Sequence, residues 1–126
     1  MKEIFELEYT LNSSPKVLFS RLSTAEGLSE WFADDVQVNG DIFSFYWDDT
    51  EQKANMALLK DNKQVKFEWI DEDSEEKYFF EFLLNIDELT GDVALMITDF
   101  AEADEKDDII NLWEAQISEL KKVLGI

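Results

Sequence analysis

The chain has 126 residues, no cysteine, and 30 acidic against 11 basic side chains, which give a formal net charge of −19. The length suits one domain with a sizeable core, so we predict a single domain over residues 1–126. The absence of cysteine excludes a disulfide framework, a thiolate nucleophile and a cysteine-rich zinc site, and the negative charge disfavours nucleic-acid partners and anionic membrane surfaces.

The first predicted element is a half-buried strand over residues 3–11, where apolar and polar residues alternate. Ser14, followed by proline, suits the N-cap of a short helix that we predict over residues 15–22. Thr24 suits the N-cap of a second short helical turn, in which Leu28, Trp31 and Phe32 are predicted to form an apolar side. The N-terminus lacks a secretory signal, and no stretch reaches the roughly 20 apolar residues of a membrane span. We therefore expect a cytoplasmic protein without integral membrane association.

Residues 36–98 alternate between apolar and polar in short segments separated by turn residues, which predicts an antiparallel meander of six strands. The first hairpin contains Asn39-Gly40, the pair best suited to a type I′ turn. Residues 71–76 form a charged connector that must face water. The predicted strands cover residues 36–38, 42–47, 52–59, 64–70, 77–85 and 92–98.

Charged side chains within each segment indicate which face of the sheet is buried, because burying a charge is costly while exposing it is not. Lys66 and Glu68, for example, point outward, so their neighbours point inward. The inward residues that this reasoning predicts are Phe43, Phe45, Trp47, Ala54, Met56, Leu58, Val65, Phe67, Trp69, Phe80, Phe82, Leu84, Val93, Leu95 and Ile97.

The chain ends in a long amphipathic helix that we predict from Asp104 to Leu124, with Asp104 as its N-cap. The helix dipole is complemented by acidic residues in the first turn and by Lys121 and Lys122 in the last. The glycine that follows suits the C-cap. At about 1.5 Å per residue the helix is roughly 30 Å long, enough to cross a sheet. Its apolar stripe comprises Ile110, Trp113, Ile117, Leu120 and Leu124.

Together these elements predict an α+β fold in which the final helix grips a curved antiparallel sheet of about seven strands. The run from Ser14 to Phe32, which ends in Trp31-Phe32, resembles the N-terminal signature of the START-like (SRPBCC) superfamily. It is most similar to the branch related to the activator of heat-shock protein 90 ATPase, and Leu112-Trp113 matches the tryptophan in that branch's last helix. The resemblance implies a helix-grip fold with a cavity between helix and sheet. Relatives bind lipids, sterols, polyketides or plant hormones there, some cyclise polyketides, and one branch binds a chaperone.

The sequence offers no catalytic constellation. Histidine is absent, unlike in the enzymatic members of the superfamily, and the acidic pairs Asp34-Asp35 and Asp48-Asp49 lie in turns, where carboxylates are normally solvated. Asp71, Asp73 and Glu75 have the spacing of a calcium loop, but the glycine and the final glutamate of such a loop are missing. We expect no catalytic residue, metal or cofactor, which leaves, as a third alternative to ligand binding and protein interaction, an enzyme whose cavity promotes a reaction only by desolvating and orienting its ligand.

One site remains, between the final helix and the sheet. Large rings on both walls would hold an apolar ligand or would fill the space at crystal-like density, and the sequence leaves both alternatives open. The first alternative predicts non-catalytic binding of a small hydrophobic or lipid-like ligand, with Tyr9 and Tyr78 as polar handles. The second predicts a protein-interaction domain, either homodimeric or chaperone-associated. The predicted cavity lining is Tyr9, Trp31, Phe45, Trp47, Met56, Phe67, Trp69, Phe80, Phe82, Ile110, Trp113 and Ile117.

Overall fold

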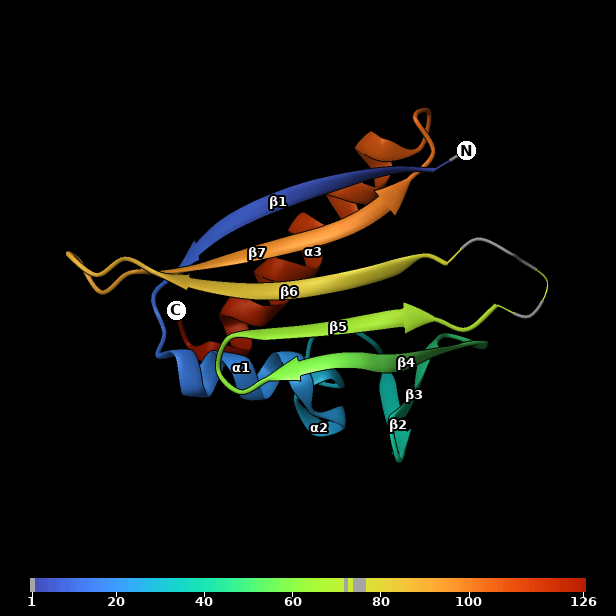
Figure 1. Ribbon diagram of the computed structural model, residues 1–126, viewed down its shortest axis with the longest axis horizontal. Coiled ribbons are helices and arrows are strands. Elements are labelled where there is room, and N and C mark those ends of the chain that lie inside the picture. The colour runs from blue at the N-terminus through green and yellow to red at the C-terminus, as the bar shows by residue number, and fades with distance from the viewer. Residues whose placement is uncertain (1, 72, 74–76) are drawn as a thin grey trace.

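The computed structural model describes residues 2–71, 73 and 77–126. Seven antiparallel strands form one sheet in the order β1-β7-β6-β5-β4-β3-β2. Figure 1 shows the outer face of this sheet, with α3 lying behind it across the other face. The elements are β1 (Glu3–Leu11), α1 (Pro15–Ser23), α2 (Ala25–Leu28), β2 (Asp35–Asn39), β3 (Ile42–Trp47), β4 (Thr50–Lys60), β5 (Gln64–Trp69), β6 (Phe79–Ile86), β7 (Val93–Ala101) and α3 (Lys106–Leu124). The predicted α+β layout is confirmed.

The two short helices form where the sequence places their caps. Ser14 and Thr24 each accept a hydrogen bond from the backbone N–H three residues further on, at 3.2 and 3.0 Å. Gly27 allows α2 to approach α1 closely, because a Cβ there would collide with the backbone of α1. The Trp31 indole N–H donates to the carbonyl of Arg21 at 2.8 Å and ties the segment after α2 to α1.

The hairpin between β2 and β3 differs from the prediction. Asn39 is the last residue of β2 and pairs with Ile42, so the two-residue loop is Gly40-Asp41. Gly40 has a φ of 64°, and neither Asn39 nor Asp41 has a positive φ. A type I′ turn needs positive φ at both central residues, so the prediction of that turn at Asn39-Gly40 was wrong.

A β-bulge in β4 overturns one prediction about the faces of the sheet. Met56 pairs with the inward Phe67, but Leu58 pairs with the outward Lys66, because the register shifts between them. The extra residue of a bulge reverses the alternation beyond it, so Leu58 faces outward, not inward. The inward residues confirmed by burial are Phe43, Phe45, Ala54, Val65, Phe67, Phe80, Phe82, Leu84, Val93, Leu95 and Ile97.

The last helix begins one residue later than predicted. Its N-cap is Glu105, without a side-chain hydrogen bond, and Asp104 lies in the preceding turn, which the N–H of Glu105 closes by bonding the carbonyl of Glu102 at 3.0 Å. The end is as predicted, with Gly125 at a φ of 73°. Within the described residues, no helix is long and apolar enough to cross a membrane.

Candidate ligand-binding site

Aromatic rings fill the middle of the interface between α3 and the sheet. Phe32, in the segment after α2, stacks on Phe80 and on Trp113, with ring centroids 5.2 and 5.7 Å apart. It also meets Phe45 edge-on at 5.3 Å. Phe45 and Phe82 beneath it are fully buried. In this central part of the interface the rings pack against one another as a solid core.

The backbone of Phe32 joins three parts of the fold. Its carbonyl oxygen accepts hydrogen bonds from the indole N–H of Trp47 in β3 at 2.8 Å and from the side-chain amide of Gln116 in α3 at 2.9 Å. These two bonds connect the segment after α2 to the sheet and to the last helix. They hold the Phe32 ring between helix and sheet.

An open cleft of about 590 Å³ lies beside the aromatic core, between the N-terminal half of α3 and strands β3, β4, β5 and β7. Its volume falls in the range of about 300–1,000 Å³ that is typical of small-molecule sites. We call it the tryptophan cleft, after the three indole rings in its walls. It is lined by Phe32, Trp47, Asp48, Thr50, Gln52, Trp69, Asp99, Ile109, Leu112, Trp113 and Gln116.

Asp99 places a carboxyl group in the wall of this cleft. One oxygen accepts a hydrogen bond from the Trp113 indole N–H at 2.8 Å, and the other accepts one from the backbone N–H of Phe100 at 2.7 Å. Burial raises the pKa of Asp99, and the two hydrogen bonds and the positive charge of Lys2 offset only part of that effect. The cleft therefore contains an acid whose charged form is poorly solvated.

Asp99 and Phe32 were not among the residues predicted to line a cavity. The strand predicted to end at Thr98 extends to Ala101, and the inward alternation through Ile97 continues to Asp99, which pairs with the inward Phe5 of β1. Continuing the alternation by one step would have found it. Phe32 was predicted on the apolar side of the second short helix, but α2 ends at Leu28, so Phe32 lies beyond it and helical spacing does not indicate its direction.

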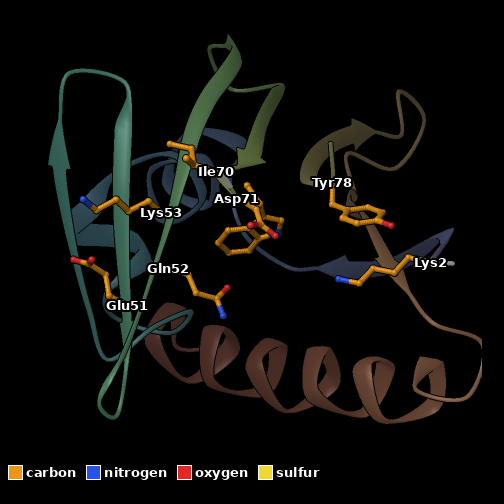
Figure 2. Close-up of a pocket in the computed structure, with 8 residues that line it drawn as sticks. Lys2, Glu51, Gln52, Lys53, Ile70, Asp71 and Tyr78 are labelled. Carbon is orange, nitrogen blue, oxygen red and sulfur yellow. The ribbon is translucent and has the colours of Figure 1, made fainter. Parts of the chain in front are cut away.

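A second, more polar cleft of about 340 Å³ adjoins the first and shares Gln52 and Trp69 with it. Figure 2 shows Gln52 extending from β4 toward α3, while Lys53 and Glu51 point away from that helix. The Lys2 ammonium lies 4.6 Å from the centre of the Tyr78 ring. This polar cleft is lined by Lys2, Glu51, Gln52, Lys53, Trp69, Ile70, Asp71 and Tyr78.

Three of the twelve residues predicted to line a cavity, Trp47, Trp69 and Trp113, line the tryptophan cleft. The buried residues Trp31, Phe45, Phe67, Phe80, Phe82 and Ile117 belong to the core around it. Tyr9, Met56 and Ile110 are partly buried and pack against that core. Burial, with the nearby Glu114, raises the pKa of Tyr9. The ligand-binding role of all twelve stays a prediction.

The carboxylates in the acidic turns bond the backbone of those turns. Asp34 and Asp48 are exposed, and the carboxylate of Asp34 accepts the backbone N–H of Asp48 at 2.7 Å. The Asp71 carboxylate accepts the backbone N–H of Asp73 at 3.0 Å, while Glu75, the third residue considered for calcium, lies outside the described residues. In the part of the chain that the structure describes, no three acidic, histidine or cysteine side chains gather in a way that could hold a metal ion.

The raised pKa of Asp99 predicts a pH-dependent difference in stability. The pKa of Asp99 in the folded state lies above the unfolded value of about 3.9, so protonation of Asp99 stabilises the folded state. This stabilisation is present at low pH and is lost as the pH rises through the folded-state pKa. The free energy of unfolding of the parent, minus that of Asp99→Asn, should therefore fall as the pH rises from about 3 to 7. Urea unfolding of both proteins at several pH values measures this difference. Asp61→Asn, which removes an exposed carboxylate, is the control; a flat or rising difference for Asp99→Asn would contradict the prediction.

Comparison with known proteins gives the same fold. A sequence model described as a START-like superfamily domain matches residues 1–126. The solution structure of BfR322 from Bacteroides fragilis is 39% identical, with a TM-score of 0.69, and the match covers 99% of this chain and 93% of that one. The Aha1 dimer from Colwellia psychrerythraea is 20% identical, with a TM-score of 0.83 and coverage of 98% and 97%. CalU16 from Micromonospora echinospora is 11% identical, with a TM-score of 0.69 and coverage of 98% and 73%. The chain matches no curated protein.

Proposed function

Because the chain belongs to the START-like superfamily, whose fold commonly binds ligands or mediates interactions, we propose that it binds a small hydrophobic, lipid-like molecule in the tryptophan cleft. The function is binding alone, without a covalent step. The absence of cysteine suits the reducing environment of the cytoplasm, where we propose that the protein acts.

The observation that supports this proposal most strongly is the cleft itself. The ring of Phe32 closes the middle of the interface, so the room for a ligand lies at the side of the rings, against Ile109 and Leu112 of α3 and the indoles of Trp47 and Trp69. Burying apolar ligand surface against such walls is favourable by about 25 cal/mol per Å². Such walls suit a ligand that is largely apolar.

Binding can be tested by blocking the cleft. Leu112 lines the cleft but is 56% exposed, so Leu112→Trp should occupy the cleft without disturbing the core. Leu89→Trp adds the same side chain at a site that is 97% exposed and outside the cleft, which makes it a matched control. We expect the parent and Leu89→Trp to bind members of a panel of sterols, fatty alcohols and fatty acids, and Leu112→Trp to lose that binding. Native mass spectrometry and tryptophan fluorescence measure it, and an absence of saturable binding by the parent would refute the proposal.

A second candidate function is protein interaction, which apolar side chains on the outer face of the sheet favour. Ile4 of β1 is 57% exposed and pairs with Phe100 of β7. The Phe100 ring contacts those of Tyr78 and Phe79, with centroids 5.3 and 5.0 Å apart. Self-association through this patch predicts a concentration-dependent mass in sedimentation equilibrium, which Ile4→Lys would abolish. A constant monomer mass would leave ligand binding as the better proposal.

A further inference from the structure

The charges around the tryptophan cleft restrict the ligand further. Asp48 and Asp99 are the ionisable residues in its lining, and among the described residues that line it there is no lysine or arginine. The whole chain carries a formal charge of −19. An anionic head group in this cleft would meet two like charges in the lining, which is costly in a partly desolvated site. The positive charge of Lys2 acts on Asp99, but Lys2 does not line the cleft, and its effect offsets only part of the cost of burying that carboxylate.

The walls of the cleft suit a positive charge. The indole N–H groups of Trp47 and Trp113 are already bonded, to the carbonyl of Phe32 and to Asp99, so these two side chains offer a ligand their aromatic surface, not a donor. Aromatic surfaces attract organic cations, and tryptophan does so best. Three indoles and a carboxylate around one cleft therefore favour a cation over an anion.

Asp99 has the capacity to receive such a cation. A carboxylate oxygen has two acceptor positions. One oxygen of Asp99 accepts a hydrogen bond from Trp113 and the other accepts one from Phe100. A donor that enters from the cleft can use the remaining positions. The same two bonds fix the orientation of the carboxyl group before a ligand arrives.

We infer that the tryptophan cleft takes apolar molecules that bear a protonated amine, with Asp99 as the residue that binds the ammonium group. This inference rests on the proposed function, since it names the class of ligand for the same cleft. The fold recognises the apolar part of the ligand through Ile109, Leu112 and the indole rings, and its charge through Asp99.

The adjoining polar cleft does not reverse this preference. Its two lysines, Lys2 and Lys53, are accompanied by two acids, Glu51 and Asp71. Lys53 lies opposite Ser44 in the register of β3 and β4, on the face of the sheet away from α3. Lys2 lies over the Tyr78 ring. Neither lysine lines the tryptophan cleft.

The experiment compares three probes with one apolar chain: octylamine, 1-octanol and sodium octanoate, at neutral pH and physiological salt. Titrations followed by ¹H–¹⁵N NMR use the indole N–H of Trp113 as the reporter, because it is bonded to Asp99. Octylamine should bind at least about tenfold more tightly than octanoate, the size expected for one charge-assisted hydrogen bond. Asp99→Asn should remove this preference, and Asp61→Asn, which changes the net charge equally at an exposed turn, should keep it.

The outcomes separate the two proposals. If octanoate binds in the cleft as tightly as octylamine, the inference about the amine fails and the proposed function stands. If octylamine perturbs only surface carboxylates, without a shift at Trp113, it acts as a counter-ion and the inference fails. If none of the three probes perturbs the cleft, both proposals fail. The comparison of probes on the parent protein decides between amine and acid even if Asp99→Asn does not fold.

Discussion

Trp113→Ala is expected to lower the free energy of unfolding by about 3–5 kcal/mol, out of the about 5–15 kcal/mol that stabilises a domain of this kind. The ring is only 5% exposed and contacts Phe32 and Phe82, with centroids 5.7 and 5.9 Å apart. Its removal leaves a cavity between helix and sheet and takes a hydrogen bond from Asp99. Urea unfolding followed by circular dichroism measures the change.

Two other substitutions separate the causes of that loss. Trp113→Phe keeps a ring but removes the hydrogen-bond donor to Asp99, so it should lower the free energy of unfolding by less than Trp113→Ala does. The expected loss is about 1.5–3 kcal/mol, the value of a hydrogen bond to a charged group. Leu112→Ala changes the neighbouring residue, which is 56% exposed, and should stay within about 0.5 kcal/mol of the parent. A Trp113→Ala variant that unfolds at the same urea concentration as the parent would mean that α3 is not packed as the structure has it.

The parts of this fold that the sequence predicts are those that depend on local patterns. The caps at Ser14 and Thr24 act within three residues, and both form as predicted. The alternation that sends Phe80 and Phe82 inward, and the three-four spacing of Trp113 and Ile117, are equally local. Each of these features needs only the residues next to it, so one sequence is enough to find it.

The errors arise where long-range pairing overrides the local pattern. The bulge that turns Leu58 outward depends on how β4 pairs with Lys66 of β5, and nothing in the alternation of β4 itself marks the skipped residue. Asp104 is a suitable cap by residue type, yet it lies in a turn closed by a backbone bond between Glu105 and Glu102, and the helix is capped one residue later, at Glu105.

The shape of the candidate site depends on contacts between distant residues. Both alternatives for the interface, a packed core and an open cleft, are present side by side, and Phe32 forms the boundary between them. Its ring meets Trp113, 81 positions later in the chain, and its carbonyl bonds Gln116, 84 positions later. A sequence pattern describes one element at a time, so it predicts which rings face inward but not where they leave space.

Phe32→Ala should therefore both destabilise the fold and extend the tryptophan cleft into the core. The ring is 5% exposed and contacts Phe45, Phe80 and Trp113, so its loss should cost about 3–5 kcal/mol. Because apolar voids of this kind accept small apolar guests, added benzene should raise the melting temperature of Phe32→Ala by more than that of the parent. Calorimetry with and without benzene measures both effects.

Phe79→Ala is the matched control, because it removes the same ring from the outer face of the sheet, where Phe79 is partly exposed beside Lys66. It should cost less stability than Phe32→Ala, and benzene should not restore it, because no enclosed space forms there. Equal costs for the two variants, or equal effects of benzene on both, would show that Phe32 does not separate the core from the cleft. A large cost and a benzene effect confined to Phe32→Ala would mean that this one side chain limits the depth of the cleft, and with it the size of ligand that the cleft admits.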